Sequence, residues 1–169
     1  LFSAFAQILM DHPKSTLLLV GGGEEKNQLE ILAQNLGIDE NIEWVGRTSK
    51  IPEFLSRMDI FVLSSLYEGF GLVLLEAMSY GLPVIARRIS AIPEVLGQDH
   101  PGLVSTDSSK EFGEKILEFS KNAKLRELCI SYQKEQLSNF SISKSRKQHN
   151  KVYKNMLMNR DWQVTNEKD

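Results

Sequence analysis

The chain has 169 residues, of which 41% are hydrophobic, and its formal net charge at pH 7 is −2. This length supports one well-buried core rather than two independent domains. A pI near 6.0 lacks the basic excess that phosphate recognition favours, which argues against nucleic acid as a partner. The single cysteine, Cys129, cannot form an internal disulfide, and the three histidines have no zinc-like spacing, so the sequence favours a reducing, cytoplasmic compartment.

Helix-like and strand-like stretches alternate along the chain from its first residue. Because Leu1–Leu9 is already helical in pattern and Leu1 is not a methionine, we expect a fragment of a longer protein. Runs typical of strands occupy Thr16–Val20, Ile42–Val45, Ile60–Leu63, Pro83–Ala86 and Gly102–Val104. Runs typical of helices occupy Glu24–Leu36, Ile51–Arg57, Gly71–Tyr80 and Ser108–Lys121. This alternation predicts an α/β fold with a Rossmann-like, doubly wound, mostly parallel sheet.

Beyond the last predicted strand the pattern is helical. Leu125–Leu137 and Ser143–Met158 predict extra C-terminal helices that pack on the sheet or reach beyond it, and the polar Val164–Asp169 predicts a loose end. We expect one domain at 1–140, a helix at 141–160 that packs on or crosses from it, and a loose tail at 161–169.

Basic residues gather on the last predicted helix. They give either a solvated face or a contact with anionic lipid or a partner domain. Because no apolar run approaches the ~20 residues that span a bilayer, any membrane contact is expected to be peripheral, at the inner face of the membrane. The residues are Lys144, Arg146, Lys147, Lys151 and Lys154.

A glycine triplet, Gly21–Gly23, follows the first predicted strand, where open α/β sheets place ligands. A dinucleotide fingerprint would require glycine at position 26, which is Lys26, and Glu24 and Glu25 put carboxylates where a pyrophosphate would bind. We therefore exclude a nicotinamide or flavin site. The triplet is either a tight turn that uses glycine's backbone freedom or the lining of a sugar-phosphate cleft.

The segment after the third predicted strand is the most informative. Gly69 and Gly71 let a ligand approach the backbone, and a helix that begins near Gly71 directs unpaired N–H groups at an anion such as a diphosphate. Glu76 is the only charged residue between Leu72 and Arg87. We expect this helix to be buried on most sides, where a carboxylate needs partners. Alternatively, Glu76 and Ser79 form the helix's solvent-exposed stripe, and Glu68 is an exposed acidic residue of the loop.

Several motifs from about Phe5 to Phe119 resemble, in order, the group 1 glycosyltransferases (glycosyltransferase family 4). Glu68-Gly69-Phe70-Gly71 with Glu76, followed by Ala77 to Ala86 and Ile92-Pro93-Glu94-Val95, is similar to that family's Glu-x7-Glu region. The stretches Leu17 to Gly23, Ile42 to Arg47, Met58 to Ser65 and Gly102 to Val104 also resemble the family. Two features depart from it: Ser90-Ala91 replaces a glycine pair, and the usual diphosphate-binding Arg and Lys have no match here.

The resemblance implies one half of a GT-B fold, the carboxy-terminal domain that binds a nucleotide sugar, with an acceptor-binding amino-terminal domain absent. It implies a retaining hexosyltransferase that acts on a hydroxyl acceptor. Glu68 would be the catalytic residue, binding the donor sugar, and Glu76 would bind the ribose. The other implied donor-binding residues are Gly69, Phe70, Gly71, Leu72, Gly22, Gly23, Val45, Gly46 and Arg47.

Without an Asp-x-Asp motif we expect no metal, and the resemblance implies no cofactor besides the nucleotide-sugar substrate. The nucleobase stays open among uracil, guanine and adenine. The isolated chain is expected to be inactive. The alternatives are a nucleotide-binding module or inactive fragment, and a sugar-nucleotide epimerase.

Overall fold

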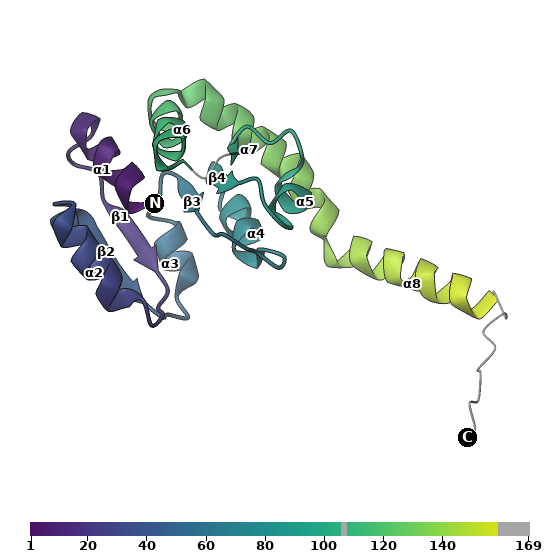
Figure 1. Cartoon of the computed structure of the whole chain (residues 1–169). Coiled ribbons are helices and arrows are strands. Elements are labelled where there is room, and N and C mark those ends of the chain that lie inside the picture. Colours follow the sequence, from purple (N-terminus) through teal and green to yellow (C-terminus); the bar gives the residue numbers. More distant parts are fainter. Residues whose placement is uncertain (106–107, 159–169) are drawn as a thin grey trace, which may run out of the picture.

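Parallel strands alternate with helices in the computed structural model, which describes residues 1–105 and 108–158 (Figure 1). The strands are β1 (Leu17–Val20), β2 (Ile42–Gly46), β3 (Phe61–Leu63), β4 (Val84–Arg87) and β5 (Leu103–Val104). The helices among them are α1 (Phe2–Asp11), α2 (Lys26–Asn35), α3 (Ile51–Leu55), α4 (Leu72–Ser79), α5 (Ile92–Leu96) and α6 (Ser109–Lys121). Every strand and helix expected in this region is present with ends within two residues, so the predicted α/β class is confirmed.

The strands form two hydrogen-bonded ladders. One contains β1 and β2, the other has the order β3-β4-β5, and every pair is parallel. In the described residues no ladder joins β1 to β3. The arrows of β1 and β3 nevertheless point the same way (Figure 1).

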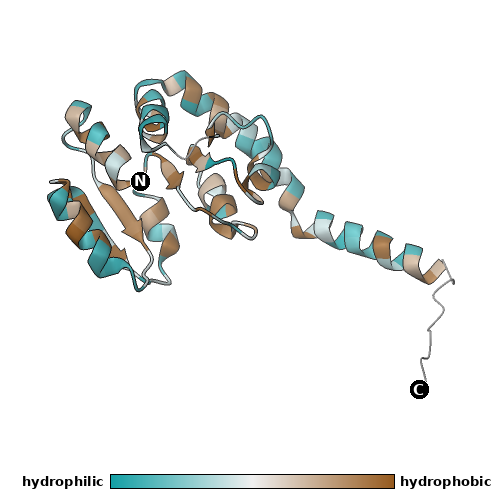
Figure 2. Cartoon of the chain, in the orientation of Figure 1, coloured by the Kyte–Doolittle hydropathy of each residue, from teal (hydrophilic) through white to brown (hydrophobic). Residues whose placement is uncertain are grey.

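Helices cover both faces of the strands, as a doubly wound fold requires. Side chains alternate along a strand, so in β4 Ile85 joins one apolar cluster while Val84 and Ala86 join the other. The first cluster contains residues of α1, α2 and α6, and the second contains residues of α3, α4 and α5. Figure 2 shows the strands as the most hydrophobic part of the fold.

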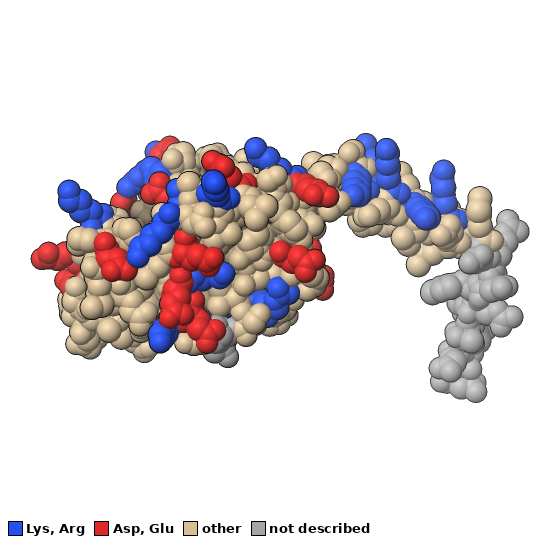
Figure 3. All heavy atoms as spheres, turned by 90° about the horizontal axis from the view of Figure 1, so that it is seen from above, with Lys and Arg blue, Asp and Glu red and all other residues tan. Residues whose placement is uncertain are grey.

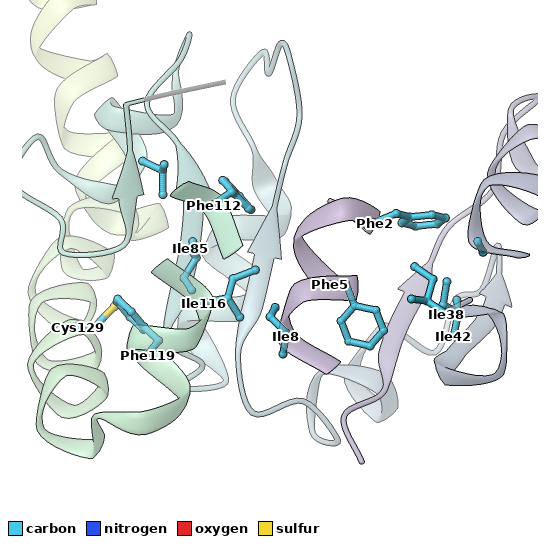
Figure 4. Packing of buried hydrophobic residues seen from close by; sticks show 12 residues of the cluster. Phe2, Phe5, Ile8, Ile38, Ile42, Ile85, Phe112, Ile116, Phe119 and Cys129 are labelled. Atoms are coloured by element: carbon cyan, nitrogen blue, oxygen red, sulfur yellow. The ribbon is translucent and has the colours of Figure 1, made fainter. Parts of the chain in front are cut away.

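Helix α1 connects the two ladders. Its Phe2 ring meets Trp44 of β2 edge-on, with centroids 6.0 Å apart. On the other side α1 lies so close to α6 that a Cβ atom at Gly113 would be 3.4 Å from the Ala4 backbone. Figure 4 shows Phe5 and Ile8 of α1 between the two groups of buried side chains. One helix thus packs against both halves of the fold.

Helix α5 was not predicted. It has five residues, and its second residue is Pro93, which suits the first turn of a helix. Such a short segment shows too little periodicity to be recognised from sequence.

Two further helices follow α6, joined by the short 3-10 turn η2 (Ser138–Phe140). Helix α7 (Ala123–Leu137) packs on the domain and buries Cys129 and Gln133. Helix α8 (Ile142–Met158) has no buried residue in its described length and projects away from the domain (Figure 1). Its surface carries a row of lysines and arginines (Figure 3).

Residues 159–169 lie outside the described residues, so the loose tail expected at 161–169 also lies outside them. No helix in the part that the structure describes combines the length and hydrophobicity needed to span a bilayer.

Candidate functional site

A glycine turn sets the start of α4. Gly71 is the N-cap residue and has φ +81° and ψ 51°, a left-handed conformation that residues with a Cβ rarely adopt. A Cβ atom there would lie 2.9 Å from Leu74 Cδ1 and 3.2 Å from Glu68 Cγ. The absence of a side chain therefore lets the loop fold back so that Glu68 packs against the start of the helix.

The amino end of α4 is open to a ligand. No side chain caps it within the described structure, so the N–H groups of Leu72 and Val73 have no helical acceptor. Leu72 and Phe70 are exposed, and Phe70 meets Phe140 edge-on at 5.8 Å. This end of the helix can accept an anion through backbone N–H groups and the helix dipole.

Glu76 lies on the open face of α4. It is exposed, as are Leu72, Ser79 and Tyr80, while Leu74 and its neighbours on the opposite face are buried. Of the two alternatives that the sequence left open for Glu76, the structure thus has the solvent-exposed stripe, which Glu76 shares with Ser79. Leu72 and Glu76 are one turn apart and share that stripe, so the carboxylate lies behind the open N–H groups on an accessible face.

The loops after β1 and β2 form a second part of the same edge. The Gly21 N–H donates to the Gly46 carbonyl oxygen at 2.9 Å, and both glycines have positive φ. A Cβ atom on Gly22 would lie 3.5 Å from Arg47 Cγ. The structure thus brings Gly22 and Arg47 together, and Gly23 and Arg47 are exposed beside the half-buried Val45.

The structure therefore gathers the predicted residues into two groups, one around α4 and one around the loops after β1 and β2. A shallow pocket of about 560 Å³ is lined by residues 20–26 and Leu29. A larger groove, about 1070 Å³, lies elsewhere, between β1 and β3, and includes none of the predicted site residues. Within the described ranges, no cluster of three metal-ligating side chains is present.

A buried polar network behind the site was missed by sequence reasoning. Gln133 Oε1 accepts the Val84 N–H at 3.1 Å, and Gln133 Nε2 donates to the Leu82 carbonyl at 2.8 Å. His100 Nε2 and Cys129 Sγ also contact this oxygen, at 3.3 and 2.8 Å. Burial lowers the pKa of His100 to about 4 and raises that of Cys129 to about 11.

The network connects α7 to the start of β4, and it fixes the strand next to the one that leads into the candidate site. The contacts of Gln133 with Leu82, Val84 and His100 join residues 33 to 51 positions apart. No local sequence signal reveals such pairings.

Residues 1–136 match the family described as "Glycosyl transferases group 1". The chain is 40% identical over 99 residues to an N-acetyl-alpha-D-glucosaminyl L-malate synthase of Bacillus anthracis, covering 59% of this chain and 26% of that protein. It is 32% identical over 143 residues to an uncharacterised glycosyltransferase of Methanocaldococcus jannaschii, covering 82% of this chain and 40% of the relative. The chain thus spans well under half the length of these relatives.

Solved structures agree with this family assignment. The C-terminal domain of the group 1 glycosyl transferase LpcC from Francisella tularensis is 28% identical, with a TM-score of 0.69, and the alignment covers 82% of this chain and 76% of that one. HepE of Anabaena, in complex with UDP and glucose, has a TM-score of 0.78 at 24% identity and covers 91% of this chain and 43% of its own. The chain therefore belongs to the group 1 glycosyl transferases and has the α/β fold of GT-B glycosyltransferases.

Proposed function

We propose that this chain is the donor-binding half of a retaining glycosyltransferase that moves a hexosyl group from a nucleoside diphosphate sugar to a hydroxyl acceptor. The observation that carries the proposal is the uncapped amino end of α4, directly after the turn in which Glu68 packs against Gly71. An anion site and a carboxylate are adjacent there, as a sugar diphosphate requires.

The diphosphate would bind at the start of α4. The N–H groups of Leu72 and Val73 and the helix dipole favour negative charge, and their alignment before the reaction stabilises the charge that develops on the departing diphosphate. Because Gly69 and Gly71 have no side chains, the diphosphate could approach the backbone here, and the exposed Phe70 lies between the two glycines in the sequence.

The two glutamates would bind hydroxyl groups of the donor. Ionised carboxylates only accept hydrogen bonds, which suits the hydroxyls of a sugar and a ribose. The half-buried Glu68, beside the anion site, would bind the transferred sugar and stabilise the reacting ring. Glu76, one helical turn further along the exposed stripe, would bind the ribose.

The nucleobase would lie against the loops after β1 and β2. Gly22, Gly23, Val45, Gly46 and Arg47 present mostly backbone there, and the Gly21–Gly46 hydrogen bond holds the two loops together. HepE and an O-GlcNAc transferase were solved in complex with UDP, which supports uridine diphosphate as the first candidate.

The acceptor would bind in the part of the longer relatives that this chain does not span. We accordingly propose that the isolated chain binds donor nucleotide without transferring sugar. A nucleotide-binding module without a transferase partner remains the alternative function, and it shares the same donor site.

Calorimetric titration with UDP, GDP and ADP tests the donor site. We expect UDP to bind and Glu76→Ala to weaken it about tenfold or more, since hydrogen bonds to a charged group contribute about 1.5–3 kcal/mol. Glu127→Ala is the matched control, because Glu127 is also an exposed helical glutamate but lies on α7. Absence of binding by all three nucleotides, or equal affinities of the two variants, would contradict the proposal.

A further inference from the structure

Helix α8 differs from α6 and α7 in that it buries none of its described residues. All of its 17 residues are exposed, and it projects from the domain after the turn η2 (Figure 1). Helices α6 and α7, by contrast, each bury residues against the domain. Because helices in proteins owe most of their stability to the packing of an apolar face, α8 is expected to bind a further surface.

One side of α8 is apolar. Its exposed apolar side chains recur at intervals of whole helical turns, so they lie along one side of the helix. This apolar stripe consists of Ile142, Val152, Tyr153, Met156 and Leu157, which are 53–82% exposed. An exposed apolar stripe of this kind marks a contact with a protein or a membrane.

The opposite side of α8 is basic. Four lysines follow one another at intervals of three or four residues, which places them along one side of the helix, away from the apolar stripe. This lysine row consists of Lys144, Lys147, Lys151 and Lys154. Arg146 lies among the apolar residues instead, where its long side chain can still reach a polar phase. Basic side chains are seen along the length of α8 in Figure 3.

The lysine row has no acidic counterpart on its own helix. Helix α8 contains five of the 20 lysines and arginines of the chain and none of its 22 acidic residues. On α2 and α6, by contrast, lysines pair with glutamates one turn away: Lys26 with Glu30 at 3.2 Å, and Lys115 with Glu118 at 2.8 Å. Like charges one turn apart on a helix repel each other, so the lysine row favours a surface of negative charge. The rest of the chain is acidic, so α8 rather than the domain would face that surface.

We propose that α8 binds the surface of an anionic lipid bilayer. Its apolar stripe would lie at the boundary between headgroups and acyl chains, and its lysines would contact lipid phosphates. Helices that lie in a bilayer surface have one apolar side and a lysine-rich polar side, and anionic lipids strengthen their binding. An uncharged surface would accept the apolar stripe but would leave the lysine row without opposite charge.

Binding through α8 would bring the candidate site close to the lipid surface. The turn η2 precedes α8, and its Phe140 meets Phe70 of the loop before α4 edge-on at 5.8 Å. Leu66 and Tyr67 in the same loop are each 79% exposed. The helix therefore leaves the domain next to the candidate site. The proposal goes beyond sugar transfer, and it holds whether or not the chain binds a nucleotide.

Sedimentation of the full chain with lipid vesicles measures this binding. The vesicles contain phosphatidylcholine alone, or equal amounts of phosphatidylcholine and phosphatidylglycerol. The test variant combines Lys144→Gln, Lys147→Gln, Lys151→Gln and Lys154→Gln, and glutamine has a helix propensity close to that of lysine. The matched control combines Lys14→Gln, Lys50→Gln, Lys124→Gln and Lys134→Gln, at exposed positions of the domain. A third variant, Tyr153→Ser with Leu157→Ser, interrupts the apolar stripe. Circular dichroism checks that each variant is folded.

We expect the parent chain to bind the mixed vesicles and to bind those of phosphatidylcholine alone far more weakly. The lysine-row variant should bind the mixed vesicles several hundredfold more weakly, at about fivefold for each lysine, and the control should bind as the parent does. The apolar-stripe variant should also bind more weakly, and an ionic strength of about 1 M should weaken the binding of the parent.

Three results would overturn the proposal. The first is no binding to the mixed vesicles, or equal binding to both kinds of vesicle. The second is an equal loss of binding in the lysine-row variant and the control. The third is a lipid-free dimer in size-exclusion chromatography that Tyr153→Ser with Leu157→Ser dissociates, which would identify a second copy of the chain as the occupant of α8.

Discussion

Replacing Gly71 with alanine tests how the turn shapes the candidate site. The residue has φ +81°, and an added Cβ atom would meet Leu74 Cδ1 at 2.9 Å and Glu68 Cγ at 3.2 Å. Leu74 is fully buried, so it cannot move aside without disturbing the core. The substitution therefore strains the backbone and displaces the carboxylate at the same time.

The expected loss of stability combines three contributions. A left-handed conformation costs an L-residue about 1–2 kcal/mol, and overpacking against Leu74 adds about 1–3 kcal/mol. Because alanine restricts the unfolded chain more than glycine does, the substitution also stabilises the folded state by about 0.4–1 kcal/mol. We expect Gly71→Ala to lower the free energy of unfolding by roughly 3 kcal/mol as the middle of this range.

Urea unfolding followed by circular dichroism measures this difference, with Gly69→Ala as the control. Gly69 lies in the same loop, has no positive φ and has no atom within 4 Å of an added Cβ. Its variant is expected to stay within about 1 kcal/mol of the parent. Equal unfolding midpoints for the two variants would refute the role assigned to the Gly71 turn.

The polar network behind the site gives three more predictions. Burial lowers the pKa of His100 to about 4 in the folded protein, whereas it is about 6.5 in the unfolded chain, so the unfolded chain binds a proton at higher pH than the folded protein does. The free energy of unfolding should therefore fall by up to about 3 kcal/mol as the pH drops from 6.5 to 4. Urea titrations at several pH values should show this dependence in the parent chain and a weaker dependence in His100→Asn. Gly102→Ala places a Cβ atom on the Val84 carbonyl oxygen and should cost more than about 3 kcal/mol, so an unchanged melting temperature would contradict this close approach of Gly102 to β4. Gln133→Leu leaves two buried backbone groups unpaired and should cost about 2–6 kcal/mol by chemical unfolding, whereas the same change at the exposed Gln34 should cost little.

Local patterns account for the parts of the fold that sequence predicted correctly. The run Pro83–Ala86 is apolar and includes two β-branched residues, which predicted a strand, and Val84, Ile85 and Ala86 of β4 are buried. Gly71 was expected at the start of a helix, and the structure places it at the N-cap of α4. These features depend on residues close together in the sequence, so periodicity and glycine placement reveal them.

The remaining features depend on contacts between distant segments. The break between β1 and β3 is a matter of pairing partners, and the strand runs at Leu17–Val20 and Phe61–Leu63 contain no mark of it. The exposure of Glu76 depends on which side of α4 faces the core, which an almost uniformly apolar helix does not disclose. Pairings such as Gln133 with β4 likewise arise only once α7 has packed.

The double role of α1 has a consequence for how the protein opens. In the described residues no ladder joins β1 and β2 to the β3-β4-β5 ladder, whereas α1 packs both on α6 and, through Phe2, on Trp44 of β2. Regions with fewer shared contacts open at lower free energy than the global transition. The β1–β2 half with α2 is thus expected to behave as a separate cooperative unit, whose opening exposes the loop that contributes Gly46 and Arg47 while the turn at Gly71 stays folded.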